Sequence, residues 1–332
     1  MSKVRSLLSV SSYWLVLVAA SALTSGDGQA NAVTQGRHPI GEASGVARHG
    51  DHVLLVDDER PGAYFRVRTP HERVSRIAPG DLEERRLGAV GVAQDYESIA
   101  VLADGRVVVL SERHRALLSE EGIVAEYDDP LSEVGTRGLE GLAVRAQADG
   151  GSEVAVVWEG GFIRTRDLPL PLRSLMKDTT VNAVVLVHTV PAGAVNLDVR
   201  ESPDVRVVTL KVPVIASRSS RDSSLRVPDV VWYRLENGRW GFIAILNAFD
   251  VQRLQRFDAE TGEPVGEPLD LGLVESLPDS VRRLELNWEG LDWFVDGEAL
   301  ILVDDTSRNR DTTQSPYLVV LPLPDEWRTR RP

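Results

Sequence analysis

Four segments of the chain share one pattern, and this pattern constrains the fold more than any other feature. Each segment has a glutamate, a small residue, an apolar pair, a turn with glycine, an apolar run and a closing acid. They read EASGVARHGDHVLLVDDER (42–60), YESIAVLADGRVVVLSER (96–113), LEGLAVRAQADGGSEVAVVWEG (139–160) and WEGLDWFVDGEALILVDD (288–305). Apolar runs joined by glycine-containing turns predict β-hairpins, and their recurrence predicts a repeat architecture.

The spacing of the segments indicates the kind of repeat. Their glutamates are Glu42, Glu97, Glu140 and Glu289. The first three are separated by about 50 residues, and the last gap is close to three such steps, which is a period typical of propeller blades. β-Branched and aromatic runs at 180–190, 205–214, 230–247 and 254–265 lie in that gap. We therefore expect an all-β fold, a six-bladed β-propeller with four-stranded antiparallel blades around a central channel.

The two ends of the chain have separate interpretations. Residues 1–32 combine a basic start, a short apolar run and the small triplet Ala30-Asn31-Ala32, which is typical of a signal peptide. An uncleaved anchor is the alternative, although the apolar run is short for a membrane span. The sequence thus predicts a signal peptide over 1–32, a single propeller domain over 33–332, no stable membrane span after cleavage, and an exported protein, periplasmic or secreted. The run at 316–324 is expected to complete a blade with the segment after residue 32.

Charge and cysteine content exclude several classes of function. The 332 residues carry a formal net charge of −13 and contain no cysteine. Nucleic acid is an improbable partner for so acidic a chain, because phosphate backbones require a basic surface. Disulfides, thiol catalysis and zinc–thiolate sites are excluded outright.

The turn positions predict that acids lie opposite each other. If Asp104-Gly105, Asp149-Gly150 and Asp296-Gly297 are two-residue turns, the register of each hairpin follows. The resulting opposed pairs are Glu97 with Glu112, Glu140 with Glu159, Glu289 with Asp304, and Glu42 with Asp58 or Glu59. Like charges directly opposed in a sheet are destabilising, so some compensation is expected.

Three compensations remain open. Calcium could bind the ring of Glu42, Glu97, Glu140 and Glu289, since carboxylate oxygens are hard ligands. Asp305 and Asp311 are further candidate ligands, because acidic and polar residues alternate from 305 to 311. Nearby arginines could neutralise the acids instead; the candidates are Arg60, Arg113, Arg137 and Arg308. The acids could also be hydrated at a channel mouth, or each glutamate could cap backbone amides between blades.

No motif identifies a nucleophile. The chain lacks a G-x-S-x-G elbow, a Walker A loop and a zinc-protease helix. His114 directly follows one of the acidic hairpin ends and is a weak candidate for a general acid or base.

With these residues in view, the chain resembles the phytase-like β-propellers, the group described as having esterase-like activity of phytase. The stretches that carry the resemblance are EASGVA (42–47), DYESIAV (95–101), LEGLAV (139–144) and NWEGLDWF (287–294). The resemblance implies an exported propeller with a polar central site, calcium dependence and phosphoester hydrolysis. Similar short motifs recur in the gluconolactonase-like calcium propellers, where an acidic metal site lies in the central channel.

Three functions follow as expectations. The first is a calcium-assisted hydrolase of phosphoesters or small esters, acting on a small anionic or ester substrate in the channel. The second is a non-catalytic propeller of the cell envelope that binds a ligand or an unidentified protein partner. The third is a lactonase-type enzyme that shares only the scaffold.

Overall fold

A computed structural model gives the fold of the chain. It describes residues 40–60, 62–88, 95–127, 138–163, 179–199, 202, 204–213, 225–248, 251–273, 287–305 and 315–328. Residues 36–332 form one compact unit. The signal peptide predicted over 1–32 lies outside the described residues and stays a prediction.

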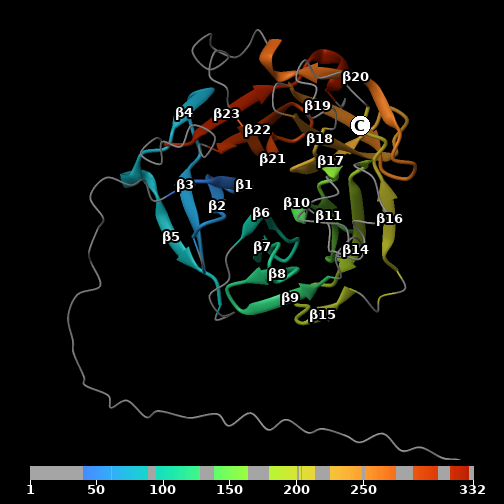
Figure 1. Ribbon diagram of the computed structural model, residues 1–332. Coiled ribbons are helices and arrows are strands. Elements are labelled where there is room, and N and C mark those ends of the chain that lie inside the picture. Colours follow the sequence, from blue (N-terminus) through green and yellow to red (C-terminus); the bar gives the residue numbers. More distant parts are fainter. Residues whose placement is uncertain are drawn as a thin grey trace, which may run out of the picture. The chain divides into compact units, whose positions relative to one another are not determined.

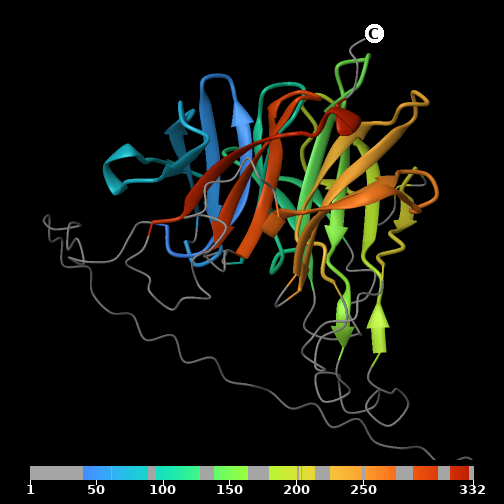
Figure 2. The ribbon, with the colours of Figure 1, turned by 90° about the horizontal axis from the view of Figure 1, so that it is seen from above.

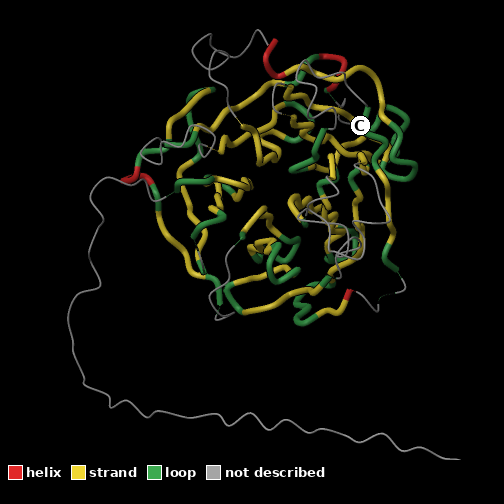
Figure 3. Tube along the Cα trace, viewed as in Figure 1, coloured by secondary structure: helices red, strands yellow, loops and turns green. Residues whose placement is uncertain are grey.

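The described strands form five antiparallel blades of four main strands each around a common axis (Figure 1). Within the described ranges strands dominate the trace, and the helical segments are short 3-10 turns (Figure 3). Blade 1 contains β1 (Ala43–His49), β2 (His52–Asp57), β3 (Ala63–Arg68) and β5 (Glu83–Arg86); blade 2 contains β6 (Tyr96–Val101), β7 (Val107–Ser111), β8 (Ala116–Ser119) and β9 (Gly122–Glu126), with β15 (Leu197–Asp198) parallel to β9; blade 3 contains β10 (Leu139–Ala146), β11 (Ser152–Trp158), β14 (Val184–Val190) and β16 (Arg206–Thr209); blade 4 contains β17 (Val230–Arg234), β18 (Trp240–Ala248), β19 (Val251–Asp258) and β20 (Pro264–Asp270); blade 5 contains β21 (Asn287–Val295), β22 (Ala299–Asp305), β23 (Tyr317–Pro322) and β4 (Val74–Arg76).

The β-propeller prediction is confirmed in its general form, but the prediction of six blades is wrong. The runs at 180–190 and 205–214 were expected to help fill additional blades. They form β14 and β16, the outer strands of blade 3. Only blade 4 lies between the blades that carry Glu140 and Glu289. Residues in this region also form a small two-stranded ladder, made of β12 (Gly161–Ile163) and β13 (Thr179–Val181).

The ring closes by pairing distant parts of the chain. The run at 316–324 forms β23, whose outer neighbour is β4, with Tyr317 opposite Arg76 and Val319 opposite Val74. The expected partner, the segment just after residue 32, is not the one observed. The connection between β3 and β5 of blade 1 instead crosses to the last blade and supplies its outermost strand.

Apolar side chains of neighbouring blades form the core. Five clusters of buried residues are present, and each lies between two adjacent blades. Phe65 of blade 1, for example, packs in one cluster with Ile301 of blade 5, and Leu110 of blade 2 packs with Trp158 of blade 3. Burial of such side chains is the main favourable contribution to folding, at roughly 25 cal/mol per Å² of apolar surface. Among the residues that the structure describes, no helix is long and apolar enough to cross a membrane.

The innermost strands β1, β6, β10, β17 and β21 approach each other closely around the axis (Figures 1 and 2). A Cβ atom added at Gly45 would lie 2.6 Å from the Cα atom of Ser98. At Gly141 it would lie 2.8 Å from the Cα atom of Asp229, and at Gly290 it would lie 2.9 Å from the Cα atom of Gly45. Glycine at positions 45, 141 and 290 is therefore required by backbone packing, and at 141 and 290 it directly follows a motif glutamate. We call Gly45, Ser98, Gly141, Asp229 and Gly290 the contact ring.

Gly290→Ala tests this close packing. The added methyl group would meet Val303 Cγ1 at 2.7 Å and the backbone N of Val46 at 2.8 Å. We expect the free energy of unfolding to fall by about 1–3 kcal/mol, as for other overpacked sites, in urea titrations. Gly80→Ala is the matched control, because no atom lies within 4 Å of its added Cβ atom. Equal stability of the two variants would contradict the proposed role of the contact ring.

Candidate functional site

Three motif glutamates occupy β-bulges at the start of the innermost strands. The register shifts by one residue between Tyr96 and Ser98, between Leu139 and Gly141, and between Trp288 and Gly290. Glu97, Glu140 and Glu289 are the extra residues. A bulge re-aims a side chain and commonly lies beside an active site. In blade 1 the shift falls between Ala43 and Gly45, so Ser44 holds this position and Glu42 precedes it.

The predicted direct opposition of acids is therefore wrong in register in blades 2, 3 and 5. In blade 1 Glu42 lies beside Asp58 as predicted, and Asp58 N donates to Glu42 O at 3.2 Å. Residue 288 pairs with Asp304, residue 96 with Ser111, and residue 139 with Trp158. One cause is the bulge. The other is turn length: Leu102 N donates to Arg106 O across a three-residue loop, and Gly105 adopts φ of 87° within it. The predicted register required a two-residue turn at this position.

Asp229 is buried where the innermost strands of several blades meet. Its Oδ1 atom accepts hydrogen bonds from the backbone N–H groups of Val230 at 2.9 Å and Leu142 at 3.0 Å, and Oδ2 accepts from Leu291 N at 2.8 Å. Ser98 Oγ lies 3.5 Å from Oδ1. One carboxylate thus joins blades 3, 4 and 5. Burial raises the pKa of Asp229, and the backbone N–H donors oppose that rise by favouring the ionised form.

The four predicted glutamates line one cavity, on the side of the contact ring where the innermost strands begin. Its volume is about 380 Å³, which lies in the usual range for small-ligand sites. We call it the acidic pocket; its lining includes Glu42, Ser44, Asp58, Glu97, Glu140, Arg226, Asn287 and Glu289. The acids come from separate blades, so the fold gathers residues that are far apart in the sequence.

Two carboxyl pairs in the acidic pocket share protons. Asp58 hydrogen-bonds to Glu42, and burial together with the charges of Glu42 and Glu97 raises the pKa of Asp58 to about 9. Glu140 hydrogen-bonds to Glu97, and burial followed by the charge of Glu112 raises the pKa of Glu97 to about 8. Burial and the charge of Glu159 also raise the pKa of Glu140. At neutral pH each pair therefore retains a proton.

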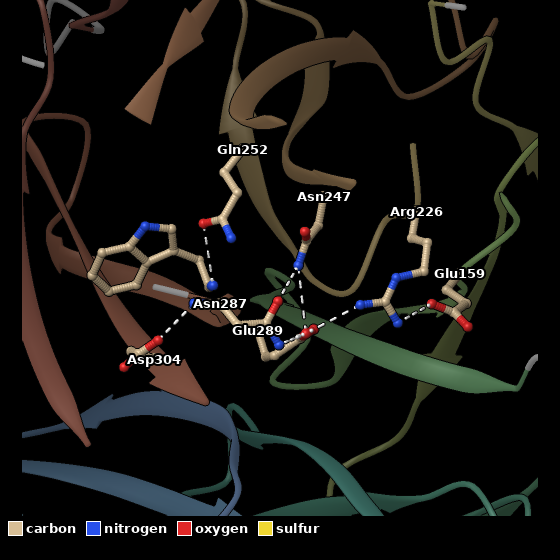
Figure 4. A network of polar contacts seen from close by, with 8 residues as sticks. Glu159, Arg226, Asn247, Gln252, Asn287, Glu289 and Asp304 are labelled. Carbon is tan, nitrogen blue, oxygen red and sulfur yellow. Dashed lines mark hydrogen bonds and ion pairs between the residues drawn. The ribbon is translucent and has the colours of Figure 1, made fainter. Parts of the chain in front are cut away.

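Glu289 is held differently, by hydrogen-bond donors (Figure 4). Its Oε1 atom lies 3.2 Å from Arg226 Nη2 and 3.4 Å from Asn247 Nδ2, and it also accepts from Asn287 Nδ2. Donors of this kind favour the charged carboxylate. Arg226 bonds Glu159 as well, at 3.1 Å. Although burial opposes it, the charges of Glu289, Glu159 and Glu140 raise the pKa of Arg226.

The remaining predicted residues surround this network. Glu159 and Asp304 are buried, and Asp304 Oδ1 accepts from Asn287 N at 2.7 Å (Figure 4). Glu112 lies near enough to Glu97 to raise its pKa. His114 is exposed in the turn between β7 and β8 and is not among the described residues that line the acidic pocket. Asp305 ends β22, whereas Asp311 lies outside the described residues.

No sequence motif marks the residues that neutralise and orient Glu289. Arg226 is the arginine that joins these acids, and it was not among the candidates; of those, Arg60 and Arg113 are exposed, and Arg137 and Arg308 lie outside the described residues. Arg226 pairs with Asn247 in an isolated β-bridge just before β17. No motif precedes β17 to reveal this, because Asp229 occupies the position that glycine or serine holds in the other blades.

The acidic pocket has the donor chemistry for calcium but not an assembled site. Its carboxylate oxygens are hard ligands, and Asp58 Oδ1 is buried without a hydrogen-bond partner. Across the described ranges, however, no three His, Cys, Asp or Glu side chains are placed so as to hold a metal ion. Calcium binding at the acidic pocket therefore stays a prediction.

Comparisons with known proteins assign no family. No family model matches the chain, and no curated protein matches it. Among solved structures, a luciferin-regenerating enzyme is 11% identical, with a TM-score of 0.39, covering 87% of this chain and 94% of that one. A putative glycoside hydrolase from Parabacteroides distasonis is 11% identical, with a TM-score of 0.45, covering 84% and 86%. The calcium-binding protein regucalcin from Agrobacterium tumefaciens is 10% identical, with a TM-score of 0.37, covering 86% and 94%. Similarity this low supports no statement about substrate or metal.

The shared protons predict an alkaline loss of stability. Asp58 and Glu97 have pKa values raised to about 9 and about 8, so the folded state binds protons that the unfolded chain releases near its ordinary carboxyl values. This stabilisation is complete below the ordinary values and is lost as pH rises through 8 and 9. We expect melting temperatures to fall between pH 6 and pH 9.

Glu97→Gln replaces one of these titrating carboxyl groups with an amide that does not ionise. We expect it to raise the free energy of unfolding at pH 9 on the order of 1 kcal/mol after solvent screening, and to flatten the pH dependence. Glu121→Gln, at an exposed position, is the matched control. A variant whose melting curve depends on pH as steeply as that of the unchanged protein would show that Glu97 is not the titrating group.

Asp229→Ala tests the carboxylate at the axis. The change leaves three buried backbone N–H groups without their acceptor, each worth about 1–3 kcal/mol. We expect a loss of at least about 3 kcal/mol in guanidinium titrations, or failure to fold. Asp229→Asn retains a carbonyl acceptor and should be the milder change. Stability unchanged in both variants would exclude the role given to Asp229.

Proposed function

We propose that the acidic pocket hydrolyses a small, uncharged ester by general acid–base catalysis. The observation that supports this most directly is that carboxyl groups with different hydrogen-bond partners line one cavity. The Glu97–Glu140 pair holds a proton at neutral pH, while Glu289 is surrounded by donors that favour the carboxylate. Environments that separate the protonation states of neighbouring acids are typical of catalytic acid and base pairs.

The charge of the pocket defines the substrate class. Five carboxyl groups line it, and the single arginine on its described lining already bonds Glu159 and Glu289. A phosphoester would add negative charge to this environment, and no cation on the described lining is left to receive it. A carboxylic ester or lactone adds no charge. Hydrolysis of phosphoesters, implied by the resemblance to phytase-like propellers, stays a prediction that requires an added cation.

Glu289 and Glu97 have different roles in this reaction. Glu289 accepts a proton from a water molecule as the water oxygen bonds to the ester carbonyl carbon. Glu97 donates a proton to the alcohol oxygen as the carbon–oxygen bond breaks, so a carboxylic acid and an alcohol leave. At this point Glu289 is protonated and Glu97 is ionised. Transfer of one proton from Glu289 to Glu97 restores the starting state. Arg226, Asn247 and Asn287 position Glu289 and do not react.

Hydrolysis of p-nitrophenyl acetate and of a small lactone by the purified protein tests this function. We expect kcat to fall by about 10²-fold or more in Glu97→Gln and in Glu289→Gln, because each removes one proton-transfer group. Each variant is assayed at a temperature at which its own melting curve at pH 6 shows it to be folded. Activity of the unchanged protein should decline above pH 8, following the pKa of Glu97. Glu121→Gln should retain full activity.

The second candidate function is ligand binding without catalysis, which the absence of a recognisable nucleophile motif favours. Assays with p-nitrophenyl phosphate, with EDTA or added calcium, separate it from the alternatives. Turnover of neither ester, lactone nor phosphoester under any of these conditions would exclude the hydrolase. Calcium-dependent phosphatase activity would instead favour the function implied by the family resemblance.

A further inference from the structure

The last described segment of the chain crosses from blade 5 to blade 4. After β23 it covers residues 323–328 and contains the short 3-10 turn Asp325–Trp327. We call residues 323–328 the C-terminal strap; it is red in Figures 1 and 2 and lies beside the orange strands of blade 4. Leu323 and Trp327 are at most 3% exposed, and both belong to the cluster of buried residues between blades 4 and 5. The strap is therefore packed onto the propeller as a bridge between two blades.

Blade 4 holds the strap through one tyrosine and one arginine. Tyr233 Oη of β17 donates to Trp327 O at 2.9 Å. Arg256 Nη1 of β19 donates to Glu326 O at 3.3 Å and to Tyr233 Oη at 3.4 Å. The guanidinium carbon of Arg256 lies 4.8 Å from the centre of the Trp327 ring and 5.9 Å from that of Tyr233. Two strands of blade 4 are thus joined to a segment that follows blade 5.

Arg256 is buried without a carboxylate. Only 8% of the residue is exposed, and no Asp or Glu of the described ranges forms an ion pair with it. Its Nε atom is buried and has no hydrogen-bond partner in the described part of the chain. A Cβ atom added at Gly266 would lie 2.5 Å from Arg256 Nη2, so the backbone of β20 covers the guanidinium group on that side. Arginine keeps its charge in proteins, and burial of an unpaired charge costs free energy.

The packed strap therefore combines favourable and unfavourable contributions. Burial of Leu323 and Trp327 and the cation–π contact favour it. Desolvation of Arg256 opposes it, because no carboxylate replaces the water that the strap displaces. The hydrogen bonds of Arg256 to Glu326 O and Tyr233 Oη are longer than usual and compensate little. When the strap leaves, Arg256 regains hydration, while the strands of blades 4 and 5 keep their own ladders.

We propose that the C-terminal strap is a latch between blades 4 and 5 that opens locally, without unfolding of the propeller. The buried charge of Arg256 sets the balance between the closed and the open position. Opening exposes Trp327 and one side of the cluster between the two blades, and blade 5 remains joined to the connection from blade 1 through β4. The latch is independent of the hydrolase proposal.

Native-state hydrogen exchange of the full chain at low guanidinium concentrations tests the latch. Leu323 N donates to Glu298 O, and Trp327 N donates to Pro324 O, both at 2.8 Å. We expect the protection factors of these two amides to be at least about tenfold lower than those of β22, and to be insensitive to denaturant, because local opening exposes little surface. Protection equal to that of β22, with the same denaturant dependence, would show that the strap opens only on global unfolding and would overturn the proposal.

Arg256→Met distinguishes a latch from simple fraying of the chain end. Methionine fills irregular space and carries no charge, so the closed strap no longer buries an unpaired cation. We expect the protection of Leu323 and Trp327 to rise by about tenfold, because replacement of a buried charge by an apolar side chain is often stabilising. If Arg256 served mainly to hold the strap by hydrogen bonds, protection would fall instead, and the role given to its charge would be refuted.

Tyr233→Phe tests the closed position from the other side and keeps the test decisive if Arg256→Met folds poorly. The change removes the hydroxyl group that donates to Trp327 O and retains the ring. We expect strap protection to fall about threefold or more, with that of β22 unchanged. Arg253→Met is the matched control, since Arg253 lies on the same strand as Arg256 but pairs with Asp270 at 3.6 Å. Strap protection that rises equally in Arg253→Met and Arg256→Met, or that Tyr233→Phe leaves unchanged, would contradict the latch.

Discussion

The close approach of five innermost strands around one axis is the constraint on which the rest of the structure depends. At the contact ring there is no room for Cβ atoms on three of the strands, so glycine is required at Gly45, Gly141 and Gly290. Where blade 4 contributes Asp229 instead, its buried carboxyl group accepts hydrogen bonds from three backbone N–H groups. Close packing and hydrogen bonding thus occur at the same level of the propeller, directly beside the residues that line the acidic pocket.

The same constraint concentrates negative charge. A bulge immediately before the contact ring turns Glu97, Glu140 and Glu289 toward the acidic pocket, where solvent is scarce and like charges are close. Repulsion is relieved by two means. Glu42 with Asp58, and Glu97 with Glu140, share protons, whereas Glu289 and Glu159 share Arg226. These two arrangements give neighbouring carboxyl groups of one pocket different electrostatic environments.

The sequence predicted the hairpins, the antiparallel propeller and a gathering of Glu42, Glu97, Glu140 and Glu289, because alternation and repeated glutamate–small pairs are local signals. The number of blades could not be read in the same way. Spacing alone does not separate a blade from outer strands and insertions, so β14 and β16 were assigned to additional blades. Arg226 and Asp229 were missed because their roles arise from segments distant in sequence. The register predicted for the acids of blade 2 was wrong because the hairpin contains a three-residue turn and a bulge, each of which shifts the pairing by one residue.

The outermost strand of the last blade has a consequence for how the chain folds. β4 comes from residues 74–76, and its neighbour β23 comes from 317–322, so one of the sequence-distant pairings in the molecule completes the ring. Non-local contacts of this kind form late, because the loop-closure entropy must be overcome first. During synthesis all four strands of blade 1 are therefore available early, whereas β4 stays unpaired until residues 317–322 have left the ribosome. Removal of β23 should consequently leave β4, a segment from the first part of the chain, without its partner.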